Sequence, residues 1–263
     1  MAPPPTLPAA LLRRAAADPE EPWLFRAEGW DWVWHPWREL AGWMERWRQA
    51  LSTLPAGSRA AFRYDARPES VILDLAIQAA GLVSAPGERR EGDLWIERRD
   101  LDIEISPPDL TSREKGDAAG AVVRIGGADV VWTTTEIVAA GERLQGVIDE
   151  TGERETIVLG GPLDDPLERS MMAWATLAGA AVVLEPDPAL RAATAAWARP
   201  TVFHGTPGEV ADLRARAGKV RKGRLPFRRL RTVLVSGEIS GEEAAFWREH
   251  GVALRTATSA ATA

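Results

Sequence analysis

The chain has 263 residues, of which 45% are hydrophobic and 27% charged, a balance typical of a globular protein with a substantial core. Its formal net charge of −6 argues against an extended nucleic-acid surface, because phosphate binding requires clustered positive charge. The absence of cysteine excludes disulfides, thiolate metal ligands and cysteine nucleophiles, and fits a cytoplasmic location. The sequence shows neither a secretory signal nor a stretch of about 18 apolar residues that could span a bilayer.

The first quarter of the chain predicts a strand followed by a helix. Residues 1–20 are rich in proline and are expected to be disordered or to lie over the surface. Trp30, Trp32 and Trp34 then show the period-2 alternation of a half-exposed strand. A helix is expected to open at Pro36, with an apolar face whose members are three and four residues apart. That face is Trp37, Leu40, Ala41, Met44, Trp47 and Leu51.

The next segment repeats the pattern of strand, helix and strand. A strand is expected at residues 59–64, and Pro68 then opens a second helix that stops at Gly81. A further strand follows at residues 82–85. Residues 94–97 and 101–105 predict two short strands, and the charged segment 107–118 reads as a linker.

The second half of the chain alternates regularly between strands and helices. Strands are expected at residues 121–125, 156–159, 181–184, 201–204, 232–235 and 252–255. Helices are expected at residues 135–150, 167–178, 188–198, 207–217 and 241–249. This alternation predicts an α/β, doubly wound fold with mostly parallel sheets covered by helices. We expect a first lobe at residues 21–106 and a second at 119–263.

Five ordered segments resemble a known family. They read WVWHPWRELAGWMERWRQALSTLPAGSRAAF at 32–62, DLAIQAAGLVSAPG at 74–87, GPLDDPLERSMMAWATLAGAAVVL at 161–184, RPTVFHGTP at 199–207 and LRTVLVSGEIS at 230–240. These segments are similar to the N-terminal part of the AMP-binding, or adenylate-forming, superfamily, closest to long-chain acyl-CoA synthetases. The resemblance implies the fold of that N-terminal domain. It also implies ATP with Mg²⁺ and CoA as cofactors, but only if the family's activity is retained.

The phosphate-binding loop of that family is shortened here. The family places TSGTTGxPKG between a strand and a helix, whereas only Gly126, Gly127 and Ala128 separate the flanking segments AVVRI and DVVWTTTEI. Such a loop aims several backbone N–H groups and a lysine at the phosphates. Two glycines without a lysine are therefore not expected to encircle a triphosphate. An alternative is that Lys115 and Gly116, in TSREKG, are a displaced remnant of the loop.

Further family motifs are also altered. Alignment of GVALRTATSAATA on the family's YGxTE motif puts Thr258 at the tyrosine and Thr262 at the glutamate that helps to hold Mg²⁺. The histidine of PLAHVFER is replaced by Asp164 or Asp165. The ribose-binding aspartate, its arginine and the small C-terminal lid with the catalytic lysine have no counterparts among the 263 residues. We therefore expect the lid domain to be absent.

Two other groups of residues carry competing interpretations. His204 ends a strand at the edge of the sheet where ligands gather in α/β folds, but the sequence offers no catalytic partner, so a structural histidine is expected. Seven of the 12 tryptophans lie between residues 23 and 47. They form either a platform for a ligand or partner or a buried aromatic subcore. The basic run 221–229 either grips an acidic partner or is a solvated loop.

The sequence thus predicts a degenerate, noncatalytic acyl-CoA-synthetase-like module that binds an acyl or nucleotide ligand or a protein partner, and no nucleic acid. The candidate nucleotide and acyl cleft residues are Gly126, Gly127, Ser236, Gly237, Glu238, Thr258 and Ser259. No catalytic or metal-ligating residue is predicted, and no cofactor is expected. Two alternatives stay open: an ATP-dependent fatty acid–CoA ligase completed by a second polypeptide, and a structural subunit of an active homologue.

Overall fold

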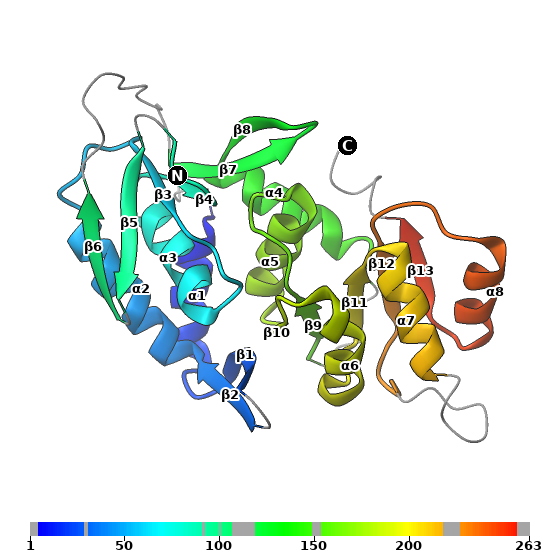
Figure 1. The fold of residues 1–263 in the computed structure, drawn as a ribbon. Helices are drawn as coiled ribbons and strands as arrows, with labels where there is room; N and C mark the ends of the chain where they lie inside the picture. The colour runs from blue at the N-terminus through cyan, green and yellow to red at the C-terminus, as the bar shows by residue number, and fades with distance from the viewer. Residues whose placement is uncertain are drawn as a thin grey trace.

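A computed structural model describes residues 5–28, 31–90, 93–99, 101–106, 119–148, 154–217 and 227–256. These residues form two mixed sheets and eight helices (Figure 1). The helices are α1 (Leu7–Ala17), α2 (Trp37–Leu51), α3 (Pro68–Ala79), α4 (Thr134–Gln145), α5 (Pro166–Ala178), α6 (Pro188–Ala198), α7 (Pro207–Ala217) and α8 (Gly241–Glu249).

The two sheets have seven and six strands. The seven-stranded sheet runs β13 (Ala253–Thr256), β12 (Thr232–Val235), β11 (Val202–Gly205), β9 (Thr156–Leu159), β10 (Ala181–Leu184), β1 (Pro22–Glu28) and β2 (Asp31–Pro36). The six-stranded sheet runs β6 (Asp102–Ser106), β5 (Leu94–Arg99), β3 (Arg59–Phe62), β4 (Val83–Pro86), β7 (Gly120–Ile125) and β8 (Ala128–Thr133). Only the pairs β1–β2, β5–β6 and β7–β8, each at a sheet edge, are antiparallel. The expected α/β architecture with mostly parallel sheets is confirmed.

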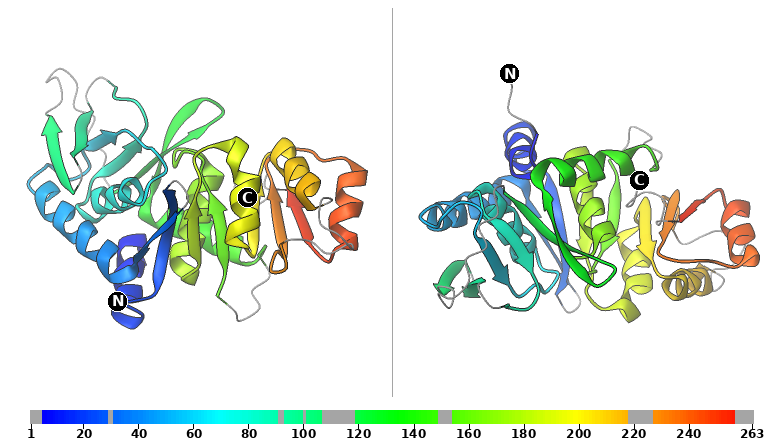
Figure 2. Two further views of the ribbon diagram at one scale, coloured as in Figure 1. Left: turned by 60° about the horizontal axis from the view of Figure 1, so that its bottom comes forward. Right: turned by 90° about the horizontal axis from the view of Figure 1, so that it is seen from above.

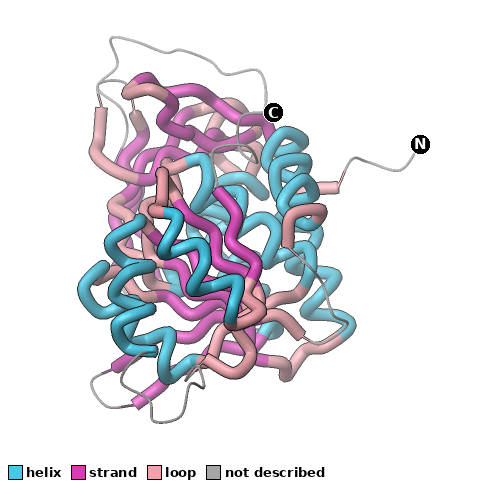
Figure 3. Tube along the Cα trace, turned by 90° about the vertical axis from the view of Figure 1, so that its right-hand side faces the viewer, coloured by secondary structure: helices cyan, strands magenta, loops and turns pink. Residues whose placement is uncertain are grey.

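Alternation along the strands divides the apolar residues between two core layers. In β9, Ile157 and Leu159 join the core that contains residues of α1 to α5, whereas Val158 faces the cluster formed with α6, α7 and α8. Because both faces are buried, these parallel strands are almost continuously apolar. Figure 3 shows helices on either side of the strands.

The sequence signals for α2 and α5 act as expected. The buried residues of α2 are the six of the predicted apolar face. Helix α5 begins where the Asp165 carboxylate accepts hydrogen bonds from the N–H groups of Leu167 and Glu168, with Pro166 in the first turn. It ends at Gly179, which takes the left-handed conformation at φ 75°.

The expectation for the N-terminal segment is wrong for residues 7–17. These residues form α1, which begins where the Thr6 side chain accepts a hydrogen bond from the N–H of Ala9. Leu7 and Leu11 are buried in the core, and α1 packs against α2 and α5 (Figure 2). Burial of these apolar side chains therefore stabilises the helix, although the segment is rich in proline.

Strands β1 and β8 were not expected. β1 lies beside β10, with Leu24 paired to Val182, and β8 forms a hairpin with β7. The seven-stranded sheet thus takes β1 and β2 from the start of the chain, and the six-stranded sheet takes β7 and β8 from beyond residue 119. The division into lobes at 21–106 and 119–263 stays a prediction, and strand pairing crosses it in both directions. The predicted linker 107–118 lies outside the described residues.

None of the helices in the described part of the chain is both long and apolar enough to cross a lipid bilayer.

Candidate functional site

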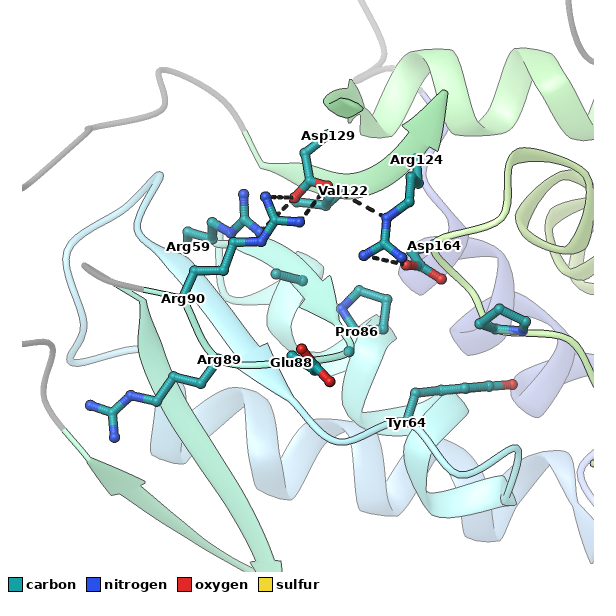
Figure 4. A pocket seen from close by; sticks show the side chains of 13 residues that line it. Arg59, Tyr64, Pro86, Glu88, Arg89, Arg90, Val122, Arg124, Asp129 and Asp164 are labelled. Atoms are coloured by element: carbon teal, nitrogen blue, oxygen red, sulfur yellow. Dashed lines mark hydrogen bonds and ion pairs between the residues drawn. The ribbon is translucent and has the colours of Figure 1, made fainter. Parts of the chain in front are cut away.

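A cavity of about 400 Å³ lies against β3, β4 and β7 of the six-stranded sheet (Figure 4). Small and apolar residues of the strands, such as Ala85 and Val122, form its floor. Segments 86–90 and 162–164 line its sides. Tyr64 also lines the cavity, and burial raises the pKa of its phenol.

Arginines and carboxylates alternate along the wall of this cavity. Asp129, at the start of β8, accepts hydrogen bonds from Arg59 at 2.8 Å and from Arg90 at 2.8 Å. Burial acts to raise the pKa of Asp129, but these two guanidinium groups hold it below its ordinary value. Arg59 also reaches Asp93 at 3.0 Å. Burial outweighs the nearby guanidinium groups there and raises the Asp93 pKa.

Arg124 connects β7 to the loop that precedes α5. Its guanidinium lies 3.2 Å from the Asp164 carboxylate, and its backbone N–H donates to the Asp164 carbonyl at 2.6 Å. Figure 4 shows Arg124 and Arg90 directed toward the same carboxylate, that of Asp129. Guanidinium forks bind carboxylate and phosphate groups in bidentate fashion. An anionic group of a ligand could therefore take the place of a carboxylate at this wall.

Gly126 and Gly127 form the turn of the β7–β8 hairpin. Their φ angles are +60° and +85°, and Ile125 pairs directly with Ala128, so the loop has two residues. Positive φ at both central residues is typical of a type I′ turn, which glycine adopts without strain. The turn presents neither a hydroxyl nor an ammonium group. The residues of this turn do not fit a nucleoside triphosphate, and they join two strands rather than a strand and a helix.

Ser236, Gly237 and Glu238 follow β12 at the carboxyl edge of the seven-stranded sheet. Ser236 is exposed, and its hydroxyl lies 2.7 Å from Nε2 of His204, at the end of β11. Nδ1 of His204 lies 3.2 Å from the carboxylate of Glu168 in the first turn of α5. Contrary to the sequence-based expectation, His204 therefore has an acidic and a hydroxyl partner.

The alternation of the two strands explains this meeting. Phe203 and Val235 face the cluster of α6 to α8, so His204 and Ser236 point to the opposite face, toward α5. Local sequence patterns do not indicate these contacts, because Glu168 and Ser236 are 36 and 32 residues away from His204. The sequence signal that could have indicated these contacts is that His204 and Ser236 both lie at carboxyl ends of predicted parallel strands, which meet at one edge of a sheet.

The predicted cleft residues fall into separate places. Gly126 and Gly127 belong to the six-stranded sheet, whereas Ser236 to Glu238 border the seven-stranded one. Thr258, Ser259 and the alternative loop residues Lys115 and Gly116 lie outside the described residues. Within the described ranges, no cluster of three or more His, Asp or Glu side chains could hold a metal ion.

The tryptophans divide between core and surface. Trp23 and Trp37 are fully buried and stack with ring centroids 4.2 Å apart. Trp32 and Trp34 on β2 are 37% and 52% exposed, and together with Trp197 of α6, which is 79% exposed, they line a second cavity of about 350 Å³. The exposed tryptophan surface, defined as Trp32, Trp34 and Trp197, is thus an apolar patch of the kind that marks an interaction site.

No protein-family model matches the chain, and no curated protein matches it in sequence. Solved structures do. The N-terminal domain of FACL13 from Mycobacterium tuberculosis matches with a TM-score of 0.74 and 14% identity over 95% of this chain and 75% of that one. CmiS6 matches with a TM-score of 0.74 and 17% identity over 97% and 72%.

A third match extends the comparison to a longer enzyme. The o-succinylbenzoate CoA synthetase MenE from Bacillus subtilis has a TM-score of 0.71 and 16% identity over 93% of this chain, which spans 57% of the MenE chain. The described fold is therefore that of the N-terminal domain of adenylate-forming enzymes, as the sequence resemblance implied.

Proposed function

We propose that this chain is a binding or interaction module that uses the N-terminal fold of adenylate-forming enzymes without carrying out acyl adenylation. The observation that carries the proposal is the two-residue turn of Gly126 and Gly127. Phosphoryl chemistry depends on preorganised donors around the transferring group, and loss of one such donor commonly costs about 10²–10³ in rate. This turn supplies no side-chain donor.

The test of this proposal is direct. The chain is incubated with ATP, Mg²⁺ and a long-chain fatty acid while pyrophosphate release is followed. We expect no release above the rate without protein. Turnover of about 1 s⁻¹ or more, an ordinary enzyme rate, would refute the proposal and favour the fatty acid–CoA ligase alternative.

The cavity beside β3, β4 and β7 is the place we assign to a small ligand with an anionic group. Arg59, Arg90 and Arg124 supply guanidinium forks for a carboxylate or a phosphate. Their present partners, Asp129 and Asp164, keep these charges compensated in the free protein. A ligand therefore binds by displacing internal ion pairs, which favours anions that offer two or more oxygens.

Calorimetry with CoA, ATP and pyrophosphate, each without metal, tests this assignment. Arg90→Ala should weaken binding of the ligand that the parent binds by about tenfold or more, because a charge-assisted hydrogen bond contributes about 1.5–3 kcal/mol. Arg99→Ala is the matched control, because Arg99 is exposed on β5 and pairs with Glu104 at 2.8 Å outside the cavity. Equal weakening by both variants, or no binding to the parent, would contradict the assignment.

A second function is favoured by the exposed tryptophan surface, and it is the structural subunit of an active homologue. Trp is enriched where protein partners contribute most binding energy, and an apolar patch on an exposed strand and helix is unfavourable in water. We expect the chain to co-elute with a full-length acyl-CoA synthetase from the same genome on size exclusion. The variants Trp34→Ala and Trp197→Ala should lose co-elution while Trp247→Phe, altered in the core, retains it. Elution that is independent of Trp34 and Trp197 would refute this role.

A further inference from the structure

Three side chains from separate elements form a continuous hydrogen-bonded chain at the carboxyl edge of the seven-stranded sheet. Ser236 Oγ lies 2.7 Å from Nε2 of His204, and Nδ1 of His204 lies 3.2 Å from Oε1 of Glu168. Solvent exposure decreases along these three hydrogen-bonded side chains: Ser236 is exposed, His204 is 7% exposed and Glu168 is 3% exposed. A hydroxyl at the surface is thus linked through an imidazole to a buried carboxylate.

Glu168 is held as an anion. Burial acts to raise its pKa, but the hydrogen bond that the carboxylate accepts from His204, the charge of Arg191 and the Gly161 N–H together hold the pKa below its ordinary value. Arg191 lies 4.0 Å from the Glu168 carboxylate. The position of Glu168 in the first turn of α5 adds the favourable field of a helix N-terminus.

An ionised Glu168 selects one tautomer of His204. Nδ1–H donates to the carboxylate, which leaves the lone pair of Nε2 to accept the proton of Ser236. The Glu168 carboxylate thus orients His204, and His204 is placed to act as a base toward the Ser236 hydroxyl. This is the arrangement of side chains used in nucleophilic acyl transfer.

The backbone after Ser236 also suits this chemistry. Ser236 directly follows β12, and residues 237–240 separate it from the start of α8. Gly237 has a φ of +137°, and a Cβ there would lie 3.3 Å from Pro207. Among the described residues, no backbone carbonyl accepts the Gly237 N–H. An N–H directly after the nucleophile is in position to stabilise a developing oxyanion.

We propose that Ser236, His204 and Glu168 form a catalytic triad that hydrolyses small acyl esters or thioesters, an activity separate from the proposed binding function. Ser236 Oγ forms a bond to the acyl carbonyl carbon, and the bond to the alcohol or thiol breaks. The Ser236 proton passes to His204 Nε2 and then to the leaving group. Water then attacks the acyl-serine, its proton passes through His204 back to Ser236, and the carboxylic acid is released.

The exposure of Ser236 and the chemistry of the leaving group together indicate the substrate class. An alkoxide or a thiolate is a better leaving group than an amide anion, so esters and thioesters are cleaved more readily than amides. An exposed hydroxyl beside a half-buried turn is accessible to a small acyl group without movement of the strands. Esters and thioesters of small acids are therefore the expected substrates.

The test uses the whole chain with a fluorophosphonate probe and with p-nitrophenyl acetate. In the probe reaction Ser236 Oγ forms a bond to phosphorus and fluoride leaves. Mass spectrometry should find the adduct on the peptide that contains Ser236. Ser236→Ala should lose the adduct and the ester hydrolysis, and His204→Gln should lower hydrolysis by about 10²-fold or more. Ser52→Ala, at an exposed serine that follows α2, is the matched control and should behave as the parent does.

Several results would overturn the proposal. The proposal is overturned if the parent carries no adduct at Ser236, if Ser236→Ala hydrolyses the ester at the parental rate, or if His204→Gln is labelled as fast as the parent. If His204→Gln does not fold, Glu168→Gln takes its place, and an undiminished labelling rate in that variant overturns the proposal equally. Circular dichroism of each variant establishes that the fold is retained.

Discussion

A single substitution that breaks the buried ion pair between Arg169 of α5 and Asp74 of α3 should lower the free energy of unfolding strongly. The guanidinium makes two hydrogen bonds of 3.0 Å to the carboxylate and a third of 2.7 Å to the Leu163 carbonyl. Asp74 also accepts from Gln78 and Ser84. The side chains of Arg169 and Asp74 are only 2% and 3% exposed, so water does not screen the pair.

The substitution Arg169→Met removes the cation and leaves the Asp74 carboxylate buried without a counter-charge. Breaking a buried pair in this way costs about 3–5 kcal/mol of the free energy of unfolding. With a urea dependence of about 3 kcal/mol per M, the unfolding midpoint should fall by roughly 1–2 M. Urea unfolding followed by circular dichroism measures it directly.

Two further variants make the reasoning testable. Arg99→Met, at a 70% exposed arginine paired with Glu104, should change the free energy by less than about 0.5 kcal/mol. The double variant Arg169→Met, Asp74→Asn should be more stable than Arg169→Met alone, because the uncompensated charge is gone. A loss below about 1 kcal/mol for Arg169→Met would refute the idea that this pair depends on mutual compensation.

Three other predictions follow from local geometry. Gly141→Ala should destabilise the fold by about 1–3 kcal/mol, because the new Cβ would lie 2.8 Å from the backbone of α5. Gly42→Ala, where a Cβ would meet nothing within 4 Å, should stabilise α2 by about 0.5–1 kcal/mol. Thermal unfolding of the two variants compares these effects. Leu11→Ala should cost about 2–5 kcal/mol in urea, and a neutral result would mean that α1 does not dock. Thr133→Ala should cost about 1 kcal/mol at pH 7. Hydrogen bonds from the Thr133 N–H and hydroxyl lower the pKa of Glu136, and Thr133→Ala loses only the hydroxyl. The part of the difference that comes from this hydroxyl is therefore present above the unfolded pKa of Glu136 and is lost as the pH falls through the folded one, and a constant difference between about pH 5 and 3 would contradict it.

The sequence predicted those elements whose own pattern was sufficient. The apolar face of α2 repeats every three and four residues between charged residues, and this contrast set its buried side. Helix α1 was missed because its prolines suggested disorder, although Thr6 before Leu7 and Pro8 is a helix start signal. Strand β8 is not predicted because the sequence analysis interprets Gly126 and Gly127 as a shortened loop between a strand and a helix rather than as a two-residue hairpin turn.

The candidate sites were harder to predict than the fold. Gly126 and Ser236 were singled out as neighbours of one cleft, and that shared cleft stays a prediction. The contacts of His204 depend on strand order and on the face to which each residue points, and neither can be read from local spacing. The cavity arginines come from β3, β7 and the loop after β4, so only the folded sheet brings them to one wall.

The place of β1 in the seven-stranded sheet has a consequence for biosynthesis. Its neighbour β10 follows roughly 160 residues later, so at about 5–20 residues per second the ribosome needs roughly 8–30 s to deliver it. During that interval the nascent β1–β2 hairpin has an open, hydrogen-bonding edge that another chain could join. Truncated transcripts that stop before residue 181 should consequently yield insoluble polypeptide or depend on a chaperone for survival.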